Sequence, residues 1–291
     1  MHRGGSSSCL GGTAVRKTVT VRLPALLRAC HPEPSLAVTS ITTALALSAG
    51  RGAGAALVAA ALLAGQLSIG WSNDWIDADR DRTAARADKP TAQRELRPEA
   101  VRTAAFTAAA ACVPLSLAMG WRAGLAHLVA VAAAWGYNLG LKSTVVSWAP
   151  YALAFGLVPS IVTLGLPGSP WAPGWATAAG ALLGVGAHLA NVLPDLDDDA
   201  ATGVRGLPHR LGGPRSAALS AVLLLAATAV LAVGPADAGG WGLVALAAAA
   251  GVTGTGLLLA RRPGSRAAFR AAIVVAGVDV ALLLAQGSSL G

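Results

Sequence analysis

Residues 53–74 read AGAALVAAALLAGQLSIGWSND, an apolar run that ends in two polar residues, Asn73 and Asp74. At 1.5 Å per residue, a helix of about 20 residues crosses the roughly 30 Å of hydrocarbon in a bilayer. The run is rich in Ala and Leu and does not alternate between apolar and polar residues, so it predicts a helix and not a strand of a closed barrel. We therefore expect it to span a membrane and to place Asn73 and Asp74 at one end of the span.

Similar apolar runs recur along the chain. Its 291 residues are 54% hydrophobic and only 12% charged, with a mean hydropathy of +0.59, and this composition excludes a water-soluble domain of the usual kind. We predict an all-α polytopic membrane protein with about nine transmembrane helices. The expected spans are 34–50, 53–74, 100–120, 123–141, 145–166, 175–195, 212–233, 239–260 and 267–287.

The N-terminal segment differs from the rest of the chain. Residues 1–29 are basic and rich in Ser and Gly, and they lack the apolar core of a signal peptide. We expect them to form a disordered cytoplasmic extension, followed by one membrane domain over residues 30–291. The three cysteines, Cys9, Cys30 and Cys112, have the spacing of neither a disulfide framework nor a zinc site.

The distribution of basic residues predicts the orientation. The net charge is +8 and the pI about 10.4, but the Lys and Arg residues lie in short loops beside apolar runs, which does not favour nucleic acid as a partner. With a cytoplasmic N-terminus, only Arg51 and Arg122 of the 22 Lys and Arg residues fall on the outer side. This split satisfies the positive-inside rule and predicts an integral plasma-membrane protein with nine spans.

Acidic residues concentrate in two segments at the ends of spans. Eight of the 14 Asp and Glu residues lie in 73–81 (NDWIDADRD) and 191–199 (NVLPDLDDD), both on the predicted cytoplasmic side. At about 100° per residue, each segment places three polar side chains on one helical face. These are Asp74, Asp77 and Asp81 in the first segment, and Asn191, Asp195 and Asp199 in the second. We expect the two faces to meet at one cavity, while Asp79, Asp197 and Asp198 stay in solvent.

Carboxylates gathered in this way point to a metal ion. They repel one another unless a cation or a proton offsets the charge, and hard oxygen ligands suit Mg²⁺. Because Mg²⁺ prefers a few carboxylates together with water and substrate phosphates, two aspartate faces could hold one diphosphate between them. A single Asp-rich helix end is usually only solvated, so the pairing of the two segments carries this prediction.

These segments resemble known motifs. Asn73 to Asp81 is similar to the NDxxDxxxD motif of the UbiA superfamily of intramembrane prenyltransferases, and Asp195 to Asp199 to its second motif, DxxxD. The resemblance extends over residues 30–287. The further similar stretches are Arg86-Ala-Asp-Lys89-Pro90, Tyr137-Asn138 with Lys142, and Gly203-Val-Arg205-Gly-Leu207-Pro208. Two departures are Pro194, where many members have Arg, and Gly206, where the usual residue is Thr.

The resemblance implies a UbiA-type bundle that transfers a prenyl group from an isoprenyl diphosphate to an aromatic or quinone-precursor acceptor beside membrane lipid. The implied Mg²⁺ ligands and catalytic residues are Asp74, Asp77, Asp81, Asp195 and Asp199. The implied substrate-binding residues are Asn73, Arg86, Lys89, Tyr137, Lys142, Asn191 and Arg205, of which the cations contact the leaving group.

Two other functions are compatible with the sequence. A UbiA-type terpene cyclase uses the same ionisation and quenches the cation within the substrate, and a cation transporter lines an ion path with carboxylates. Two intramembrane polar residues are interpreted as structural. His188, seven residues before Asp195, faces the same side deeper in the span and is expected to bond to another helix more readily than to an acceptor. Asp279 is expected to have a buried packing partner.

Overall fold

The computed structural model describes residues 23–84, 89–236, 240–260 and 265–290, and in this part of the chain every regular element is a helix. This confirms the all-α prediction. Each expected span coincides with a helix of 15 to 23 residues. These helices are α2 (Pro32–Ser48), α3 (Gly54–Ile76), α5 (Pro98–Ala118), α6 (Trp121–Leu139), α7 (Ala149–Thr163), α8 (Gly174–Val192), α11 (Gly213–Val233), α12 (Gly240–Leu259) and α13 (Ala267–Ala285).

Six of these helices are long and apolar enough to cross a membrane: α3, α5, α8, α11, α12 and α13. The protein is therefore an integral membrane protein by the length and composition of its helices. Helix α7 is apolar but has only 15 residues, and α2 has 17. The number of nine transmembrane helices stays a prediction.

Local sequence explains where several helices begin and end. Proline lies in the first turn of α2 and of α5, where its missing N–H costs no intrahelical hydrogen bond. Helix α6 ends at Gly140, which has a φ of 152° that other residues rarely adopt. Pro194 ends α8 by interrupting its hydrogen bonds, and a 3₁₀ turn, Leu193–Asp195, follows.

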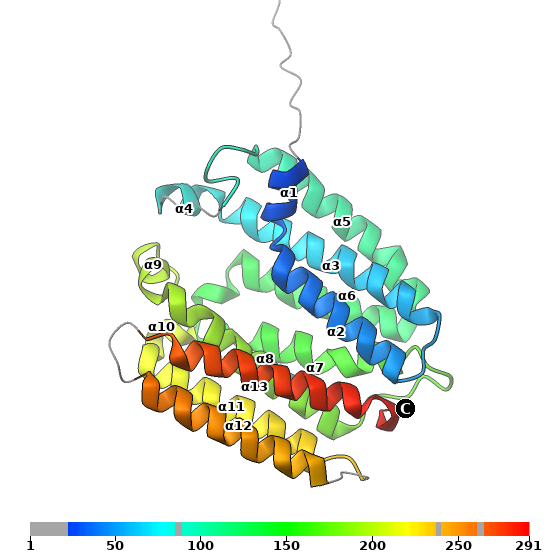
Figure 1. Cartoon of the computed structure of the whole chain (residues 1–291). Coiled ribbons are helices and arrows are strands. Elements are labelled where there is room, and N and C mark those ends of the chain that lie inside the picture. Colours follow the sequence, from blue (N-terminus) through cyan, green and yellow to red (C-terminus); the bar gives the residue numbers. More distant parts are fainter. Residues whose placement is uncertain (1–22, 85–88, 237–239, 261–264, 291) are drawn as a thin grey trace, which may run out of the picture.

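The long helices close into a ring. Each packs against the next along the chain from α2 to α13, and α13 returns to contact α2. Figure 1 shows α2, α3 and α5 on one side of the molecule and α11, α12 and α13 on the other. The main apolar core includes Leu45, Val58, Ile161 and Leu231, and it joins α2, α3, α6, α7, α8, α11 and α13.

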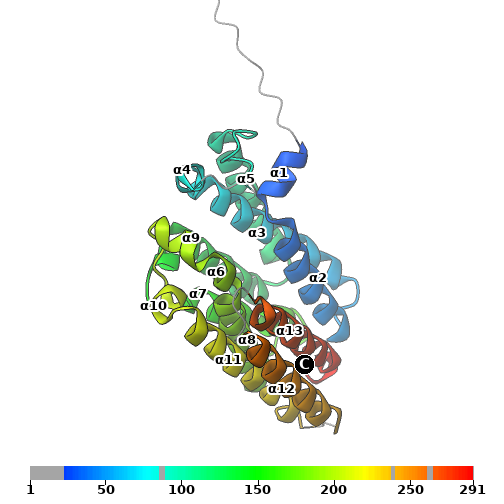
Figure 2. The same cartoon turned by 60° about the vertical axis from the view of Figure 1, so that its left-hand side comes forward.

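Four short helices lie in or beside the Asp-rich segments, and two of them fall in the stretches whose spacing predicted a helical face. They are α1 (Leu23–Ala29), α4 (Ala78–Thr83), α9 (Leu196–Ala201) and α10 (Leu207–Leu211). Helix α1 corrects the expected disordered extension in its last seven residues, because Ala25 and Ala29 pack against Leu96 and Val101. Residues 1–22 lie outside the described part. Helices α4 and α9 lie at the same end of the ring in both views (Figures 1 and 2).

Glycine allows two helices of the ring to approach closely. A Cβ atom on Gly184 of α8 would lie 2.5 Å from the carbonyl oxygen of Tyr151 and 2.8 Å from the Cβ of Phe155, both in α7. Contacts of this length are too short for real atoms, so an added methyl group must push the helices apart.

We expect Gly184→Ala to lower the free energy of unfolding by about 1–3 kcal/mol, because the overpacked α7–α8 contact outweighs the gain in helix propensity. Thermal unfolding in detergent measures this effect. Gly277→Ala in α13 is the control, since nothing lies within 4 Å of its added Cβ, and its melting temperature should stay equal or rise. Equal stability of the two variants would contradict the close approach.

Candidate functional site

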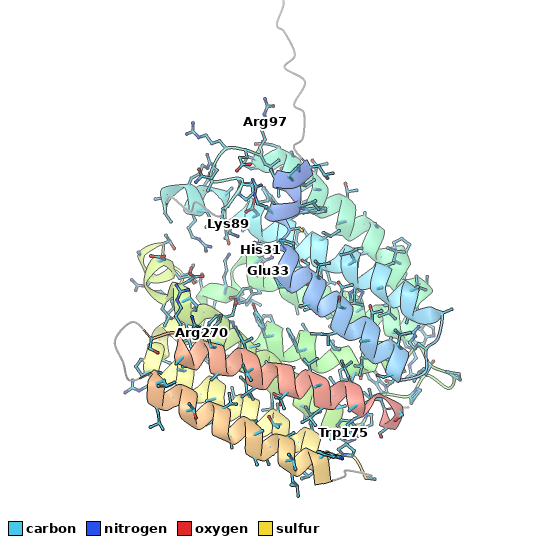
Figure 3. All side chains as sticks on the ribbon, viewed as in Figure 1. His31, Glu33, Lys89, Arg97, Trp175 and Arg270 are labelled. Carbon is cyan, nitrogen blue, oxygen red and sulfur yellow. The ribbon has the colours of Figure 1, made fainter. Side chains whose placement is uncertain are left out.

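A cavity of about 900 Å³ lies inside the ring. Side chains of α2, α3, α6, α7, α8 and α13 line it, and the Asp-rich segments form its polar end. Away from them the lining becomes apolar, with Leu62, Val131, Val158 and Ile161. Figure 3 shows Lys89, Arg97 and Arg270 toward the end of the bundle that carries α4, and Trp175 at the opposite end. The cavity can thus hold a molecule with one charged and one apolar part.

The first Asp-rich segment bends at Asp77. Helix α3 ends at Ile76 and α4 begins at Ala78, so the segment is not one regular helix. Asp77 lines the cavity and accepts hydrogen bonds from Lys142 Nζ at 2.5 and 2.6 Å, Arg80 Nη2 at 2.8 Å and Asn73 Nδ2 at 3.0 Å. Asp77 is therefore held in place by hydrogen bonds from three side chains.

The three aspartates that the sequence placed on one face do not all reach the cavity. Asp81 lines the cavity beside Asp77, and its Oδ1 lies 3.6 Å from Arg80 Nη2. Asp74 is fully buried and is not among the described residues that line the cavity. Its nearest cation is Lys89, whose Nζ lies 3.9 Å from Asp74 Oδ1. The structure thus brings two of the three carboxylates to the cavity and places Asp74 behind its wall.

The second Asp-rich segment lies on the opposite side of the cavity. Asn191, Asp195 and Asp199 all line it, although they belong to α8, the 3₁₀ turn after it and α9. The break at Pro194 redirects the chain, yet the three side chains still face one space. His209 of α10 lies 3.5 Å from Asp199 Oδ2.

Cations between the two segments balance this charge. Lys142 is buried in the 3₁₀ turn Leu141–Ser143, where burial lowers the pKa of its ammonium group and the neighbouring Asp77 carboxylate opposes that shift. Lys89 Nζ lies 2.7 Å from His31 Nε2 and donates to Asn73 Oδ1 at 3.1 Å. Both lysines line the cavity, so their ammonium groups can face an anionic ligand.

Two other predicted cations do not reach the site in the described structure. Arg205 is exposed and is not among the described residues that line the cavity, which differs from the contact implied by the resemblance. Arg86 falls in residues 85–88, outside the described part of the chain.

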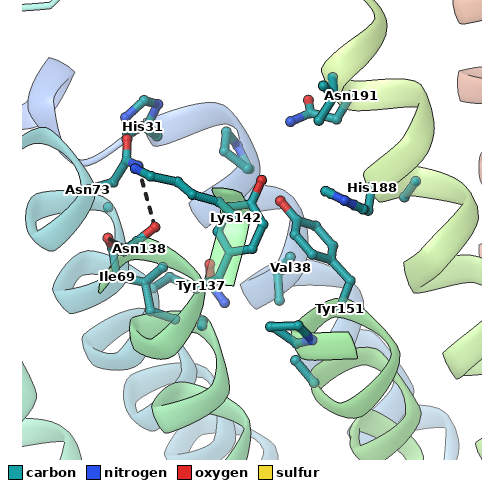
Figure 4. A pocket seen from close by; sticks show the side chains of 18 of the residues that line it. His31, Val38, Ile69, Asn73, Tyr137, Asn138, Lys142, Tyr151, His188 and Asn191 are labelled. Atoms are coloured by element: carbon teal, nitrogen blue, oxygen red, sulfur yellow. Dashed lines mark hydrogen bonds between the residues drawn. The ribbon is translucent and has the colours of Figure 1, made fainter. Parts of the chain in front are cut away.

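An aromatic wall lies below the polar end. Tyr137 of α6 meets Tyr151 of α7 edge to face at 5.2 Å between ring centroids, and Tyr151 lies parallel to Phe155 at 6.2 Å. His188 of α8 completes the wall, 4.7 Å from Tyr151 and 5.7 Å from Tyr137. Figure 4 shows Tyr137, Tyr151 and His188 with Lys142 and Asn191 around the pocket. Such faces favour a nearby cation.

Sequence reasoning missed several residues of the cavity. Arg80 lies within the first Asp-rich segment but was read as an orienting charge, although it bridges Asp77 and Asp81. Asn138 is buried and donates to Ser72 Oγ at 2.8 Å, which connects α6 to α3. The position of Asn138 directly after Tyr137, in a stretch similar to the family's, could have indicated it. No sequence motif marked His31 or Tyr151.

The donor set fits Mg²⁺ bound together with a ligand. Carboxylate and amide oxygens line both sides of the polar end, and these are hard donors. In the described part of the chain, no three His, Cys, Asp or Glu side chains are close enough to hold a metal ion by themselves. Mg²⁺ rarely uses such a protein cage and completes its octahedron with water and substrate phosphates. The residues present therefore suit a metal that arrives with a diphosphate.

Comparison with known families agrees with this geometry. The sequence profile of the UbiA prenyltransferase family matches residues 36–285. The chain belongs to the UbiA prenyltransferase family. This confirms the resemblance found in the two Asp-rich segments. No curated protein sequence matches the chain.

Solved structures of UbiA homologues share the fold. A homologue from Archaeoglobus fulgidus bound to GPP and Mg²⁺ is 17% identical, with a TM-score of 0.67 over 91% of this chain and 100% of that one. The apo structure of a homologue from Aeropyrum pernix K1 is 20% identical, with a TM-score of 0.67 over 87% and 98%. A structure described for digeranylgeranylglyceryl phosphate synthase is 15% identical, with a TM-score of 0.67 over 92% and 99%.

Proposed function

We propose that the protein is a Mg²⁺-dependent prenyltransferase that transfers a prenyl group from an isoprenyl diphosphate to an aromatic or quinone-precursor acceptor in the membrane. The observation that carries this proposal is the single cavity lined by carboxylates of both Asp-rich segments, with lysines beside them and an apolar interior. The Archaeoglobus fulgidus homologue, which binds GPP and Mg²⁺, supports the same donor class.

The lining of the cavity indicates how the isoprenyl diphosphate would lie in it. Its diphosphate lies at the polar end, where Lys142, Lys89 and Arg80 offset its charge, and its tail extends along the apolar lining. Asp77, Asp81, Asp195 and Asp199 hold the metal, with Asn73 and Asn191 as supporting oxygen donors and Asp74 acting from behind through Lys89. Bound Mg²⁺ supplies Lewis-acid stabilisation of the charge that grows on the diphosphate.

The reaction follows from that pose. As the C1–O bond of the donor breaks, its electron pair leaves with the diphosphate, and the lysines stabilise the developing anion. The allylic carbon is left beside Tyr137 and Tyr151, whose faces stabilise positive charge and whose bulk excludes water. An electron-rich carbon of the acceptor then forms the new bond to C1 and loses its proton to the released diphosphate.

We infer that the polar end faces the cytoplasm. The two basic residues assigned to the outer side bond to the opposite end of the ring: Arg51 Nη2 donates to the carbonyl oxygen of Met119 at 3.0 Å, and Arg122 Nη1 to that of Ser169 at 2.8 Å. The remaining Lys and Arg residues follow the positive-inside pattern with the Asp-rich segments.

A turnover assay tests the function. Purified protein in nanodiscs receives radiolabelled geranylgeranyl diphosphate, Mg²⁺ and a panel of phenols, naphthols and quinols, and both diphosphate release and lipid products are followed. We expect acceptor-dependent prenylated product, its loss with EDTA and its recovery with added Mg²⁺. A hydrocarbon or terpene alcohol formed without acceptor would identify a cyclase instead, and Mg²⁺ flux into liposomes without diphosphate turnover would favour a transporter.

A further inference from the structure

His188 holds a buried polar atom that the structure leaves without a partner. The residue is 1% exposed, lines the cavity and projects from α8 toward Tyr151 (Figure 4). Its Nε2 lies 3.1 Å from Ser147 Oγ, while its Nδ1 has no hydrogen-bond partner among the described residues. Buried polar atoms without a partner are rare in folded proteins, and a bound ligand is one of the recognised reasons for them.

The contacts of Ser147 bear on which nitrogen of His188 carries the proton. Ser147 Oγ accepts a hydrogen bond from the backbone N–H of Leu207 at 3.0 Å, and its own proton is still available for donation. When Ser147 donates that proton to His188 Nε2, 3.1 Å away, Nε2 is the acceptor of the pair. In this arrangement neutral His188 carries its own proton on Nδ1, and the unpartnered atom is a hydrogen-bond donor.

The position of this donor indicates what it binds. Asn191 follows one turn later in α8 and Asp195 comes after the end of that helix, so His188 lies deeper in the cavity than the residues assigned to diphosphate. Its ring forms part of the aromatic wall with Tyr137 and Tyr151. The reacting carbon of the acceptor must approach the prenyl C1 at this level, immediately inside the diphosphate.

We propose that His188 is an acceptor-binding residue, whose Nδ1–H donates a hydrogen bond to a hydroxyl or carbonyl oxygen of an aromatic acceptor held against Tyr137 and Tyr151. This inference rests on the proposed prenyl transfer and adds the recognition of the acceptor. The two tyrosine rings cover the imidazole in this structure, so binding requires one of them to turn aside. An acceptor without an oxygen near its reacting carbon leaves the donor unpaired and binds less well.

Two substitutions distinguish the roles of the two ring nitrogens of His188. The amide of asparagine can place an N–H near the position of Nδ1 but does not reach Ser147, whereas the oxygen of glutamine can accept from Ser147 but leaves no donor at Nδ1. If His188 binds the acceptor, asparagine preserves the important contact. If it only connects α8 to Ser147 and the segment before α10, glutamine preserves it.

The experiment measures the KM of the best phenol or naphthol acceptor, and that of geranylgeranyl diphosphate, for the wild type, His188→Gln and His188→Asn in nanodiscs with Mg²⁺. We expect His188→Gln to raise the acceptor KM about tenfold and His188→Asn to stay within threefold, with the diphosphate KM unchanged in both. Size-exclusion profiles and the unchanged diphosphate KM establish that the variants are folded.

Three results would overturn the inference. A greater loss in His188→Asn than in His188→Gln identifies a structural connection through Ser147. A raised diphosphate KM assigns His188 to the donor, and a lower kcat at constant acceptor KM assigns it to orientation of the tyrosines. An active wild type with any of these outcomes retains the proposed function, whereas a wild type without acceptor-dependent product removes both proposals.

Discussion

Asp77→Asn is expected to lower kcat for diphosphate release by about three orders of magnitude. The side chain keeps its size, but it loses the charge that holds Lys142 and Arg80 and that would bind Mg²⁺. A carboxylate that ligates a catalytic metal contributes several kcal/mol of transition-state stabilisation, and about 4 kcal/mol corresponds to a thousandfold change in rate. Single-turnover release of labelled diphosphate measures the effect directly.

Asp79→Asn is the matched control in the same segment. The Asp79 side chain is 94% exposed and bonds to the neighbouring Arg82 in the described structure, so its loss should change kcat by less than threefold. Size-exclusion profiles of the two variants should match that of the wild type. Comparable activity of Asp77→Asn and Asp79→Asn would remove Asp77 from the site.

The helical bundle could be predicted because long apolar runs leave the chain few alternatives in lipid. The helices begin and end within about four residues of most expected boundaries, and Pro32 and Pro98 mark two starts. The short helix α1 could not be predicted in this way. Its helical state depends on contacts with distant residues, such as Leu96 and Val101, which no local pattern reveals.

The helical spacing of the aspartates predicted part of the candidate site. Asp77 and Asp81 line the cavity, but Asp74 does not, although the backbone hydrogen bonds from Asp77 to Asn73 and from Asp81 to Asp77 keep the helical spacing. The aromatic wall was predicted only in part, because Tyr137 lies in a matched stretch and His188 was expected on the side of Asp195, whereas Tyr151 carries no motif. Arg205 lies in a stretch similar to the family's motif, yet it is not among the described residues that line the cavity.

Lys142 illustrates how the ring assembles the site from distant residues. It follows α6, and the φ of 152° at Gly140 turns the chain so that its ammonium group reaches Asp77, 65 residues away in sequence. The pair is buried, which makes each partner costly to remove alone. In the proposed reaction the same ammonium group stabilises the departing diphosphate.

We expect Lys142→Met to lower kcat by about 10²–10³-fold, the usual cost of removing one donor that stabilises a developing anion. Lys142→Arg should recover part of the loss, because it restores the positive charge with a different geometry. Arg97→Gln is the control, since it removes a positive charge from the exposed side of the same end of the bundle, and it should leave kcat within threefold. Prenyl diphosphate turnover in nanodiscs measures all three. If Lys142→Met retained wild-type kcat while its melting temperature fell, the lysine would serve only to neutralise Asp77, and the leaving group would depend on Lys89 and Arg80 for its positive charge.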